Sequence, residues 1–434
     1  MQKSVASTAA ALAVFASLAA FSPQVAQAAT LIVDRFDDPK PANASACSPA
    51  GNDCSLRGAV IKANRTPGAD TIRLQGGTYT LTRAGSGGDE NTASVGDLDL
   101  KQPVTVIGVS GTIIDAAAVN DRAFEVSGSG TFTLKRVVIR GGQALEWQAN
   151  YVGGGILTSN PDATLILTGV TLRGNVAGDG GGLFSYGPVI MTGCVVTGNS
   201  SSGIDASNTI TITNSTISGN KSAGIHTDGP GQISRSTIAN NSGAGLKAKY
   251  AESWTIAECT ISGNTGDGVQ WSDDEGDSLT IVNSTISGNG GTGVWALSAP
   301  AVSVDSSTIV RNARGLRAGL SEGAPCSLSY RNSVIADNGV DCSSTVGGVL
   351  VSQSFNLGSD GTCAAEATDA TAADPKLGPL GAHGGPTMTH ALLPGSPAID
   401  SGAVCPATDQ RDVSRPRDGD GNGSAACDRG SFER

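Results

Sequence analysis

Hydrophobic and polar residues alternate in short runs along most of the chain. The stretch Ile210–Asn220 has the sequence ITITNSTISGN, so Ile210, Ile212 and Ile217 are separated by Thr, Asn and Ser. An alternation with a period of two predicts short β-strands with one buried face, and the Gly-Asn pair predicts a bend after them. Helical repeats would need longer amphipathic runs, so the pattern favours an all-β chain.

The bend recurs at a nearly constant interval. Its Asn is found every 21 to 26 residues, at Asn175, Asn199, Asn220, Asn241, Asn264, Asn289, Asn312 and Asn338. A fixed period of this size, filled with short β runs, is typical of a solenoid whose repeats bury their apolar faces against one another. We therefore predict a parallel β-helix in which each repeat forms one coil of two or three short strands.

Equivalent residues of successive coils form ladders, because neighbouring parallel strands lie about 4.8 Å apart. One predicted inward ladder contains the aliphatic residues Leu183, Ile204, Ile225, Leu246, Val269, Val294 and Leu316. The Asn residues form another, which we interpret as structural because Asn tolerates bends and its amides pair along a stack. Cys194 and Cys259 share one ladder position three coils apart, too far for a disulfide, and are predicted to be free thiols.

Successive side chains of a strand point to opposite faces, so the residue after each inward aliphatic residue points outward. These outward positions are Phe184, Asp205, His226, Lys247, Gln270, Trp295 and Arg317. Two residues further on lies a second outward row, formed by Tyr186, Ser207, Asp228, Lys249, Ser272, Leu297 and Gly319. We call the two rows together the ladder face. A plainly solvated face would also vary in this way, because water accepts any side chain.

The ladder face suits an extended polysaccharide. Phe184, Tyr186 and Trp295 are candidate platforms for sugar rings, in a chain with only 4% aromatic residues. Lys249 and Arg317 are candidate partners for the carboxylates of a uronic-acid polymer. We predict that these five residues bind substrate.

Four further residues of the ladder face are candidate catalytic groups. In a β-elimination, Lys247 would neutralise the substrate carboxylate, while His226 or Lys247 itself would remove the adjacent proton. Asp205 and Asp228 would instead hold a calcium ion, or serve as the acid and base of a glycosidase. Calcium is therefore a candidate cofactor, and no residue is assigned as a metal ligand.

Composition and charge narrow the class of protein. Sixty glycines and few aromatic residues suit a turn-rich β architecture, and a net charge of −11 argues against a nucleic-acid binder. Residues 1–28 have the charged, apolar and small-residue order of a signal peptide, and no later segment is apolar for long enough to span a membrane. We expect a monomer that is secreted or periplasmic.

The nine cysteines of an exported chain predict disulfides and leave at least one thiol unpaired. Short separations make small loops feasible for three pairs, namely Cys47 with Cys54, Cys342 with Cys363, and Cys405 with Cys427.

Both ends of the predicted solenoid carry distinct motifs. Cys54–Asn64, with the sequence CSLRGAVIKAN, predicts a short amphipathic helix that is capped by Ser55 and covers the open first coil. This stretch resembles the CSLREA segment of a group of exported bacterial β-helix proteins. The tail, from GSPAIDSG at Gly395–Gly402 onward, is similar to the C-terminal region that many of them share, often named for the choice of surface anchor that follows. The resemblance implies a right-handed parallel β-helix and export, and no settled activity.

The chain departs from the family pattern at two positions. Gly58 stands where the family motif usually has Glu, which weakens the helix slightly. The chain ends at Arg434 with no anchor after the tail, so we expect release or periplasmic residence rather than surface attachment.

The tail also contains an acidic motif. Asp418, Asp420 and Asn422 begin like a calcium loop, but Arg429 occupies the twelfth position, where an EF-hand requires Glu, so an EF-hand is excluded. A solvated acidic turn and a looser calcium-stabilised turn both remain open. His383 and His390, in a Gly- and Pro-rich segment, are interpreted as incidental.

We therefore predict a pectate-lyase-like, right-handed parallel β-helix with an N-terminal capping helix and an irregular, disulfide-containing C-terminal cap. The expected divisions are a signal peptide at 1–28, an N-terminal cap and first strands at 29–100, coils at 101–345 and a C-terminal cap at 346–434. The favoured function is the binding and lyase cleavage of an extended polysaccharide. A non-catalytic adhesin or structural surface protein and a glycoside hydrolase are the alternatives.

Overall fold

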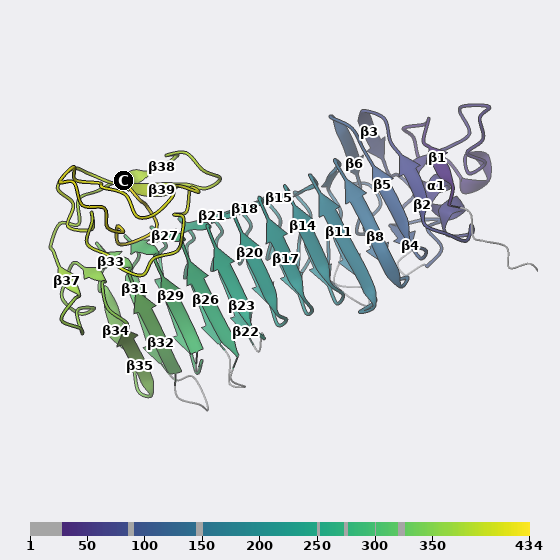
Figure 1. The fold of residues 1–434 in the computed structure, drawn as a ribbon. Coiled ribbons are helices and arrows are strands. Elements are labelled where there is room, and N and C mark those ends of the chain that lie inside the picture. The colour runs from purple at the N-terminus through teal and green to yellow at the C-terminus, as the bar shows by residue number, and fades with distance from the viewer. Residues whose placement is uncertain are drawn as a thin grey trace, which may run out of the picture.

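The chain winds into a parallel β-helix in which successive coils add short strands to three sheets. The computed structural model describes residues 28–85, 91–144, 151–249, 252–272, 277–299, 301–319 and 326–434, so residues 1–27 of the predicted signal peptide lie outside it. Figure 1 shows the strands stacked along one axis, from α1 at the N-terminal end to β35 and β37 at the other. The prediction of an all-β parallel solenoid is confirmed.

We name the sheets in the order in which a coil meets them. The first sheet contains β1 (Thr30–Ile32), β2 (Asp70–Arg73), β5 (Val104–Ile107), β8 (Gly130–Lys135), β11 (Ala163–Thr168), β14 (Val189–Thr192), β17 (Ile210–Thr213), β20 (Gly231–Ser234), β23 (Trp254–Ala257), β26 (Ser278–Val282), β29 (Ala301–Asp305), β32 (Cys326–Arg331) and β35 (Gly348–Ser352). The second sheet contains β3 (Gly77–Thr80), β6 (Thr112–Asp115), β9 (Val138–Arg140), β12 (Thr171–Arg173), β15 (Val195–Thr197), β18 (Thr216–Ser218), β21 (Thr237–Ala239), β24 (Thr260–Ser262), β27 (Thr285–Ser287), β30 (Thr308–Val310), β33 (Val334–Ala336), β36 (Leu357–Gly358) and β37 (Ala370–Thr371). The third sheet contains β4 (Leu98–Leu100), β7 (Phe124–Val126), β10 (Ile156–Thr158), β13 (Leu183–Ser185), β16 (Ile204–Ala206), β19 (Ile225–Thr227), β22 (Leu246–Lys249), β25 (Val269–Ser272), β28 (Thr292–Leu297), β31 (Arg314–Gly319) and β34 (Cys342–Ser344).

The inward aliphatic ladder is confirmed in register. Leu183 pairs with Ile204, Ile204 with Ile225, and so on to Leu316, through six consecutive strand pairings of the third sheet. All seven of these side chains are fully buried. The core therefore runs the length of the solenoid as stacked rows, and each coil depends on its neighbours for burial.

The Asn residues form a buried hydrogen-bonded stack between the second and third sheets. Each side-chain amide nitrogen donates to the side-chain oxygen of the next Asn, over distances of 2.9 to 3.2 Å, from Asn175 to Asn338. Asn338 ends the stack by donating to Asp341 over 3.1 Å. The structural interpretation of this ladder is confirmed.

The cysteines follow the predicted arrangement. The three disulfides are Cys47–Cys54, Cys342–Cys363 and Cys405–Cys427, as expected. Cys194 and Cys259 are buried free thiols in a row otherwise filled by Ser, and Cys326 is a third buried thiol. Burial raises the pKa of Cys259 to about 12, so its reactive thiolate form is scarce at neutral pH.

The helix α1 (Leu56–Ala63), preceded by the short 3-10 turn η1 (Pro41–Asn43), packs on the first coils. Ser55 caps it by accepting a hydrogen bond from the Gly58 backbone nitrogen over 3.1 Å, as predicted. At Gly58, a Cβ would lie 1.8 Å from the Ala44 carbonyl oxygen, so a Glu side chain has no room here. Arg57 is buried, pairs with Asp38, and donates to the carbonyl oxygens of 93, 96 and 97. No helix among the residues described is long and apolar enough to cross a membrane.

The C-terminal segment folds back along the outer face of the second sheet. Figure 1 shows this yellow segment, with the antiparallel pair β38 (Leu377–Gly381) and β39 (Thr389–Leu392), lying beside β27 and β33. Gln410 donates to the Cys259 carbonyl oxygen, and Ser431 bonds Thr308, over 3.1 and 3.0 Å. The segment therefore packs on the outer face of the second sheet in the last coils. It does not simply extend the solenoid beyond its last strands.

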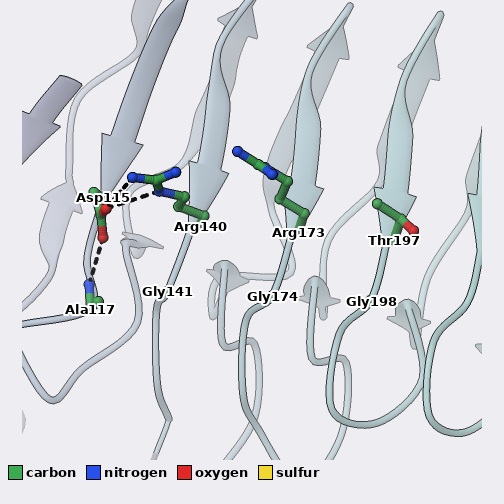
Figure 2. Close-up of a pocket in the computed structure, with 8 residues that line it drawn as sticks. All are labelled: Asp115, Ala117, Arg140, Gly141, Arg173, Gly174, Thr197 and Gly198. Atoms are coloured by element: carbon green, nitrogen blue, oxygen red, sulfur yellow. Dashed lines mark hydrogen bonds and ion pairs between the residues drawn. The ribbon is translucent and has the colours of Figure 1, made fainter. Parts of the chain in front are cut away.

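The N-terminal half of the second sheet is not covered by this segment. Its outer face holds a depression of about 490 Å³ that is bordered by Arg140 and Arg173 on neighbouring strands (Figure 2).

His390 couples this docking to pH. Its buried ring donates from Nδ1 to the Gly378 carbonyl oxygen over 2.7 Å, and in the neutral ring Nε2 accepts from the Ser287 hydroxyl over 2.8 Å. Burial lowers the pKa of His390 to about 4 from an ordinary value of 6.5. Because the unfolded chain binds the proton more tightly, the stabilising contribution is complete above about pH 6.5 and is lost as the pH falls toward 4.

We expect the free energy of unfolding to fall by at most about 3 kcal/mol between neutral pH and about pH 4 through this group. Urea unfolding at a series of pH values measures it. In the variant His390→Gln this component should vanish, and an identical pH dependence in both proteins would contradict the role of His390.

Candidate functional site

The ladder face is the outer surface of the third sheet. The predicted row of outward residues is in register, with Phe184 paired to Asp205, Asp205 to His226, His226 to Lys247, and the pairing continuing through Gln270 and Trp295 to Arg317. The second row is also in register from Lys249 through Ser272 and Leu297 to Gly319. Tyr186, Ser207 and Asp228 directly follow their strands. The stacking of the coils therefore sets the order of the candidate residues.

The expectation that the whole ladder face is exposed is wrong at its N-terminal end and, in the second row, also at Leu297 and Gly319, which are buried. Phe184 is 8% exposed and Asp205 is 6% exposed. The turn before β13 packs on Phe184. The contact is close, since a Cβ at Gly180 would lie 2.8 Å from the Phe184 Cβ. The turn before β16 covers Asp205, and its Ser202 hydroxyl lies 3.4 Å from the Asp205 carboxylate. Tyr186 stays 39% exposed and meets the Phe184 ring edge-on, so it is the accessible aromatic side chain of this pair.

The row continues toward the N-terminus with residues that the sequence reasoning did not reach. Leu157 pairs with Phe184, Glu125 with Leu157, and Asp99 with Glu125, and all three are buried. Glu125 is held by Arg122 over 2.9 Å. The irregular period of these early coils hid their register. Since they are covered, the accessible part of the ladder face begins near Tyr186 and His226.

Asp205 and His226 form the most specific feature of the ladder face. The His226 Nδ1 lies 3.0 Å from the Asp205 Oδ2, across neighbouring strands. Because a carboxylate only accepts, Nδ1 donates this hydrogen bond. In the neutral ring the proton is therefore on Nδ1, and Nε2 carries the lone pair. The bond to Asp205 is the largest cause that raises the pKa of His226, and burial opposes it. The His226 side chain is 29% exposed, so solvent reaches it.

We expect Asp205→Asn to lower the pKa of His226, because the variant removes the carboxylate that stabilises the imidazolium. A titration followed by NMR of the ring protons measures the value, and His390, which should titrate near pH 4, is an internal reference. In the wild type the pair stabilises the fold fully below about pH 6.5, and this contribution is lost as the pH rises through the raised pKa. An unchanged His226 titration in the variant would contradict the pairing.

Lys247 and Asp228 flank His226. Lys247 is the next residue of the same row, about 4.8 Å further along the stack, and is exposed. Asp228 follows β19 two residues after His226 and is also exposed. The charge of Asp228 raises the pKa of His226 and that of Lys247 lowers it, so both act on the ring electrostatically. Lys249 lies on the same strand as Lys247 and is exposed.

Trp295 and Arg317 form the other end of the ladder face. The Arg317 guanidinium carbon lies 4.7 Å from the centre of the Trp295 ring system, a cation–π contact between neighbouring strands. Asp267, which the sequence reasoning missed, accepts from the Thr292 backbone nitrogen over 2.6 Å, and burial raises its pKa. From His226 to Arg317 the row spans four strand spacings, about 19 Å. A polar and charged surface of this length suits an extended ligand.

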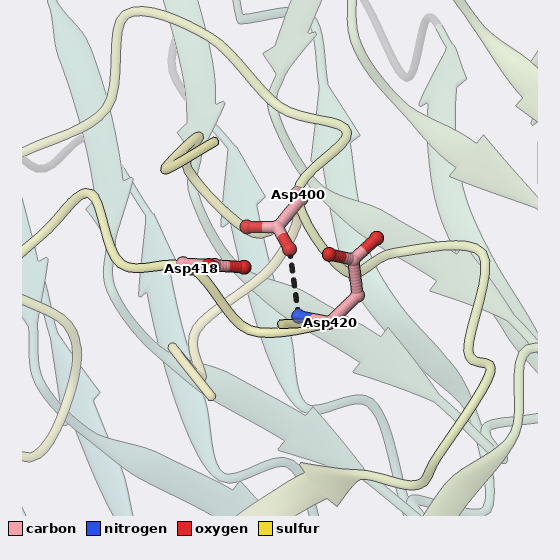
Figure 3. Close-up of side chains that lie close together, drawn as sticks. All are labelled: Asp400, Asp418 and Asp420. Carbon is pink, nitrogen blue, oxygen red and sulfur yellow. Dashed lines mark hydrogen bonds between the residues drawn. The ribbon is translucent and has the colours of Figure 1, made fainter. Parts of the chain in front are cut away.

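The acidic motif of the tail lies in a separate place. Asp400, Asp418 and Asp420 each bring a carboxylate oxygen within 4.8 Å of the others (Figure 3). Asp418 accepts backbone hydrogen bonds from 421, 422 and 423, over 2.8 to 3.1 Å, as an acidic turn does. Arg429 donates to the carbonyl oxygens of Ser401 and Asn356 instead of binding a metal.

Known proteins share the fold. Residues 223–362 match the family model for the right handed beta helix region, which confirms the predicted hand of the coils. The crystal structure of pectate lyase Pel9A is similar with a TM-score of 0.52 and 16% identity, over 94% of this chain and 96% of that one. The A-module of mannuronan C-5 epimerase AlgE6 from Azotobacter vinelandii gives a TM-score of 0.46 and 16% identity, over 67% and 91%. No curated protein sequence matches the chain. The chain is therefore a pectate-lyase-like, right-handed parallel β-helix.

Proposed function

We propose that the protein is a secreted lyase that binds a uronic-acid polysaccharide along the ladder face. The observation that carries the proposal is the Asp205–His226 pair at 3.0 Å, with Lys247 exposed on the next coil. Three disulfides fit an oxidising compartment. A pectate lyase has the same fold, which is consistent with the proposal as an analogy of fold.

Each of these residues has a separate role in a β-elimination. His226 removes the proton from the carbon beside the substrate carboxylate through Nε2, while Asp205 holds the ring and stabilises the imidazolium that forms. The electron pair becomes a carbon–carbon double bond and the adjacent carbon–oxygen bond breaks. The leaving oxygen takes a proton from solvent water, and His226 later returns its proton to solvent. Lys247 neutralises the carboxylate, which makes the proton easier to remove.

The remaining candidates bind the chain. Tyr186 and Trp295 would contact sugar units. Arg317, which lies over one face of the Trp295 ring, and Lys249 would bind further carboxylates. These residues lie on both sides of His226 along the stack, so the scissile unit would sit over the middle of a bound chain. Phe184 supports Tyr186 from below rather than contacting the sugar.

The geometry favours elimination over hydrolysis. A glycosidase needs two carboxyl groups that face each other across the scissile bond. Asp205 is buried and bound to His226, which leaves Asp228 as the exposed carboxylate of the predicted pair. A calcium ion shared by these two residues would likewise compete with His226 for Asp205.

A single assay tests the reaction class. The mature protein is incubated with polygalacturonate, alginate and a neutral glucan, each with calcium or with a chelator. With at least one acidic polymer we expect both new unsaturated ends, seen by ultraviolet absorbance, and new reducing ends. With the neutral glucan we expect neither product. New reducing ends without unsaturated ends would contradict the lyase proposal and indicate a hydrolase. Binding without either product would favour a non-catalytic adhesin.

A further inference from the structure

The depression on the second sheet lies on a different face from the ladder face. It is formed where β6, β9, β12 and β15 end, and its lining includes Asp115, Arg140, Arg173 and Thr197. These four residues are register partners on four consecutive strands, so they form one row about 14 Å long. The C-terminal segment contacts this sheet further along, at Thr260, Thr285 and Thr308.

Two cations and one anion occupy this row. Asp115 and Arg140 pair side chain to side chain, with distances of 2.9 Å to Nε and 2.7 Å to Nη2. Asp115 also accepts from the Ala117 backbone nitrogen over 3.1 Å. Arg173 is exposed, and within the described part of the chain its guanidinium forms no hydrogen bond or ion pair. Figure 2 shows it extended toward Arg140. The row therefore carries one positive charge without a protein counterpart, in a chain whose net charge is −11.

The floor beside the arginines is free of side chains. Gly174 and Gly198 follow Arg173 and Thr197 and have left-handed φ values of +62° and +65°. A Cβ built on either glycine would meet nothing within 4 Å, so the space above them is open. Beyond Thr197 the row continues with Ser218, whose hydroxyl lies 3.5 Å from the Thr197 hydroxyl. Because Thr197 and Ser218 have small hydroxyl side chains, the surface next to the depression is polar and does not protrude.

We infer that Arg173, together with Arg140, binds an oxyanion group of an acidic glycan, as a second glycan contact remote from the ladder face. A guanidinium donates two parallel hydrogen bonds to a carboxylate or a sulfate ester, and the Thr197 and Ser218 hydroxyls suit the neighbouring sugar hydroxyls. The negative net charge repels polyanions in general, so attraction requires a local group of cations, as found at this spot and on the ladder face. The inference does not require the ladder face to be catalytic.

The test uses the full mature chain carrying His226→Gln, so that no substrate is consumed. The backbone amide signals of Gly174 and Gly198 are followed by NMR during titration with a galacturonate oligomer, a sulfated oligosaccharide of similar length, a neutral oligosaccharide and inorganic sulfate. We expect saturable shifts with the first or the second probe, and which of them binds more tightly identifies carboxylate or sulfate as the group recognised.

Matched variants locate the contact. Arg173→Gln should weaken binding at these two signals by about tenfold or more, and Arg173→Lys should be intermediate because it keeps the charge and loses the planar fork. Arg65→Gln removes the same charge from an exposed position elsewhere and should bind like the parent protein. Absence of shifts, equal binding of inorganic sulfate alone, or an equal loss in Arg65→Gln would each overturn the inference.

Discussion

Replacing His226 by Gln is expected to reduce turnover of an acidic polysaccharide by about a hundredfold to ten-thousandfold, because this variant removes the proposed general base. Gln fills a similar volume and can still donate a hydrogen bond to Asp205, so the ladder face should keep its shape. The measurement is the initial rate of appearance of unsaturated ends, compared with the binding affinity for the same polymer. We expect the rate to fall while the affinity changes little.

His383→Gln is the matched control for this prediction. His383 lies in the C-terminal segment, where its ring meets Phe432 edge-on at 6.0 Å, and it has no part in the proposed reaction. The control should retain full turnover. Normal turnover in His226→Gln, combined with its loss in Lys247→Ala, would contradict the assignment and make Lys247 the base.

The second large effect is expected in the buried Asn stack. Asn241 is fully buried, and its Oδ1 accepts from both the backbone and the side-chain nitrogen of Asn220, over 3.1 and 3.0 Å. Its own Nδ2 donates to Asn264 and to the Ile217 carbonyl oxygen. Asn241→Ala deprives two buried donors and two acceptors of these partners and leaves a cavity, so we expect a loss of about 3 to 5 kcal/mol in the free energy of unfolding.

Chemical denaturation of the wild type and the variant measures this loss. Asn43→Ala is the control, because Asn43 is exposed in the turn η1, and its effect should stay within about 0.5 kcal/mol. A ladder variant as stable as the control would show that the stack contributes little to the fold.

The periodic part of the fold was predictable because one physical rule governs it. Once Ile204 and Ile225 are placed inward, the strand alternation fixes Asp205 and His226 as outward neighbours, and the structure has both pairs in register. The free thiols Cys194 and Cys259 followed from their ladder position, and the three disulfides from short separations, whereas the third free thiol, Cys326, was not predicted.

The rest depended on contacts between segments that are distant in sequence. Periodicity says which way a side chain points and not what lies over it, so the burial of Phe184 and Asp205 by adjacent turns was missed. The docking of the C-terminal segment rests on single polar contacts, such as His390 with Ser287, that carry no repeat signal. Gly58 was interpreted by helix propensity alone, whereas the close carbonyl oxygen of Ala44 explains it.

A crystal structure of His226→Gln with a galacturonate or mannuronate oligomer would show directly whether the ladder face binds the glycan. We expect a glycan chain that runs along the third sheet from Tyr186 to Arg317, with one carboxylate at Lys247 and a sugar ring at Trp295. An oligomer bound on another face, or no bound oligomer at a saturating concentration, would contradict it.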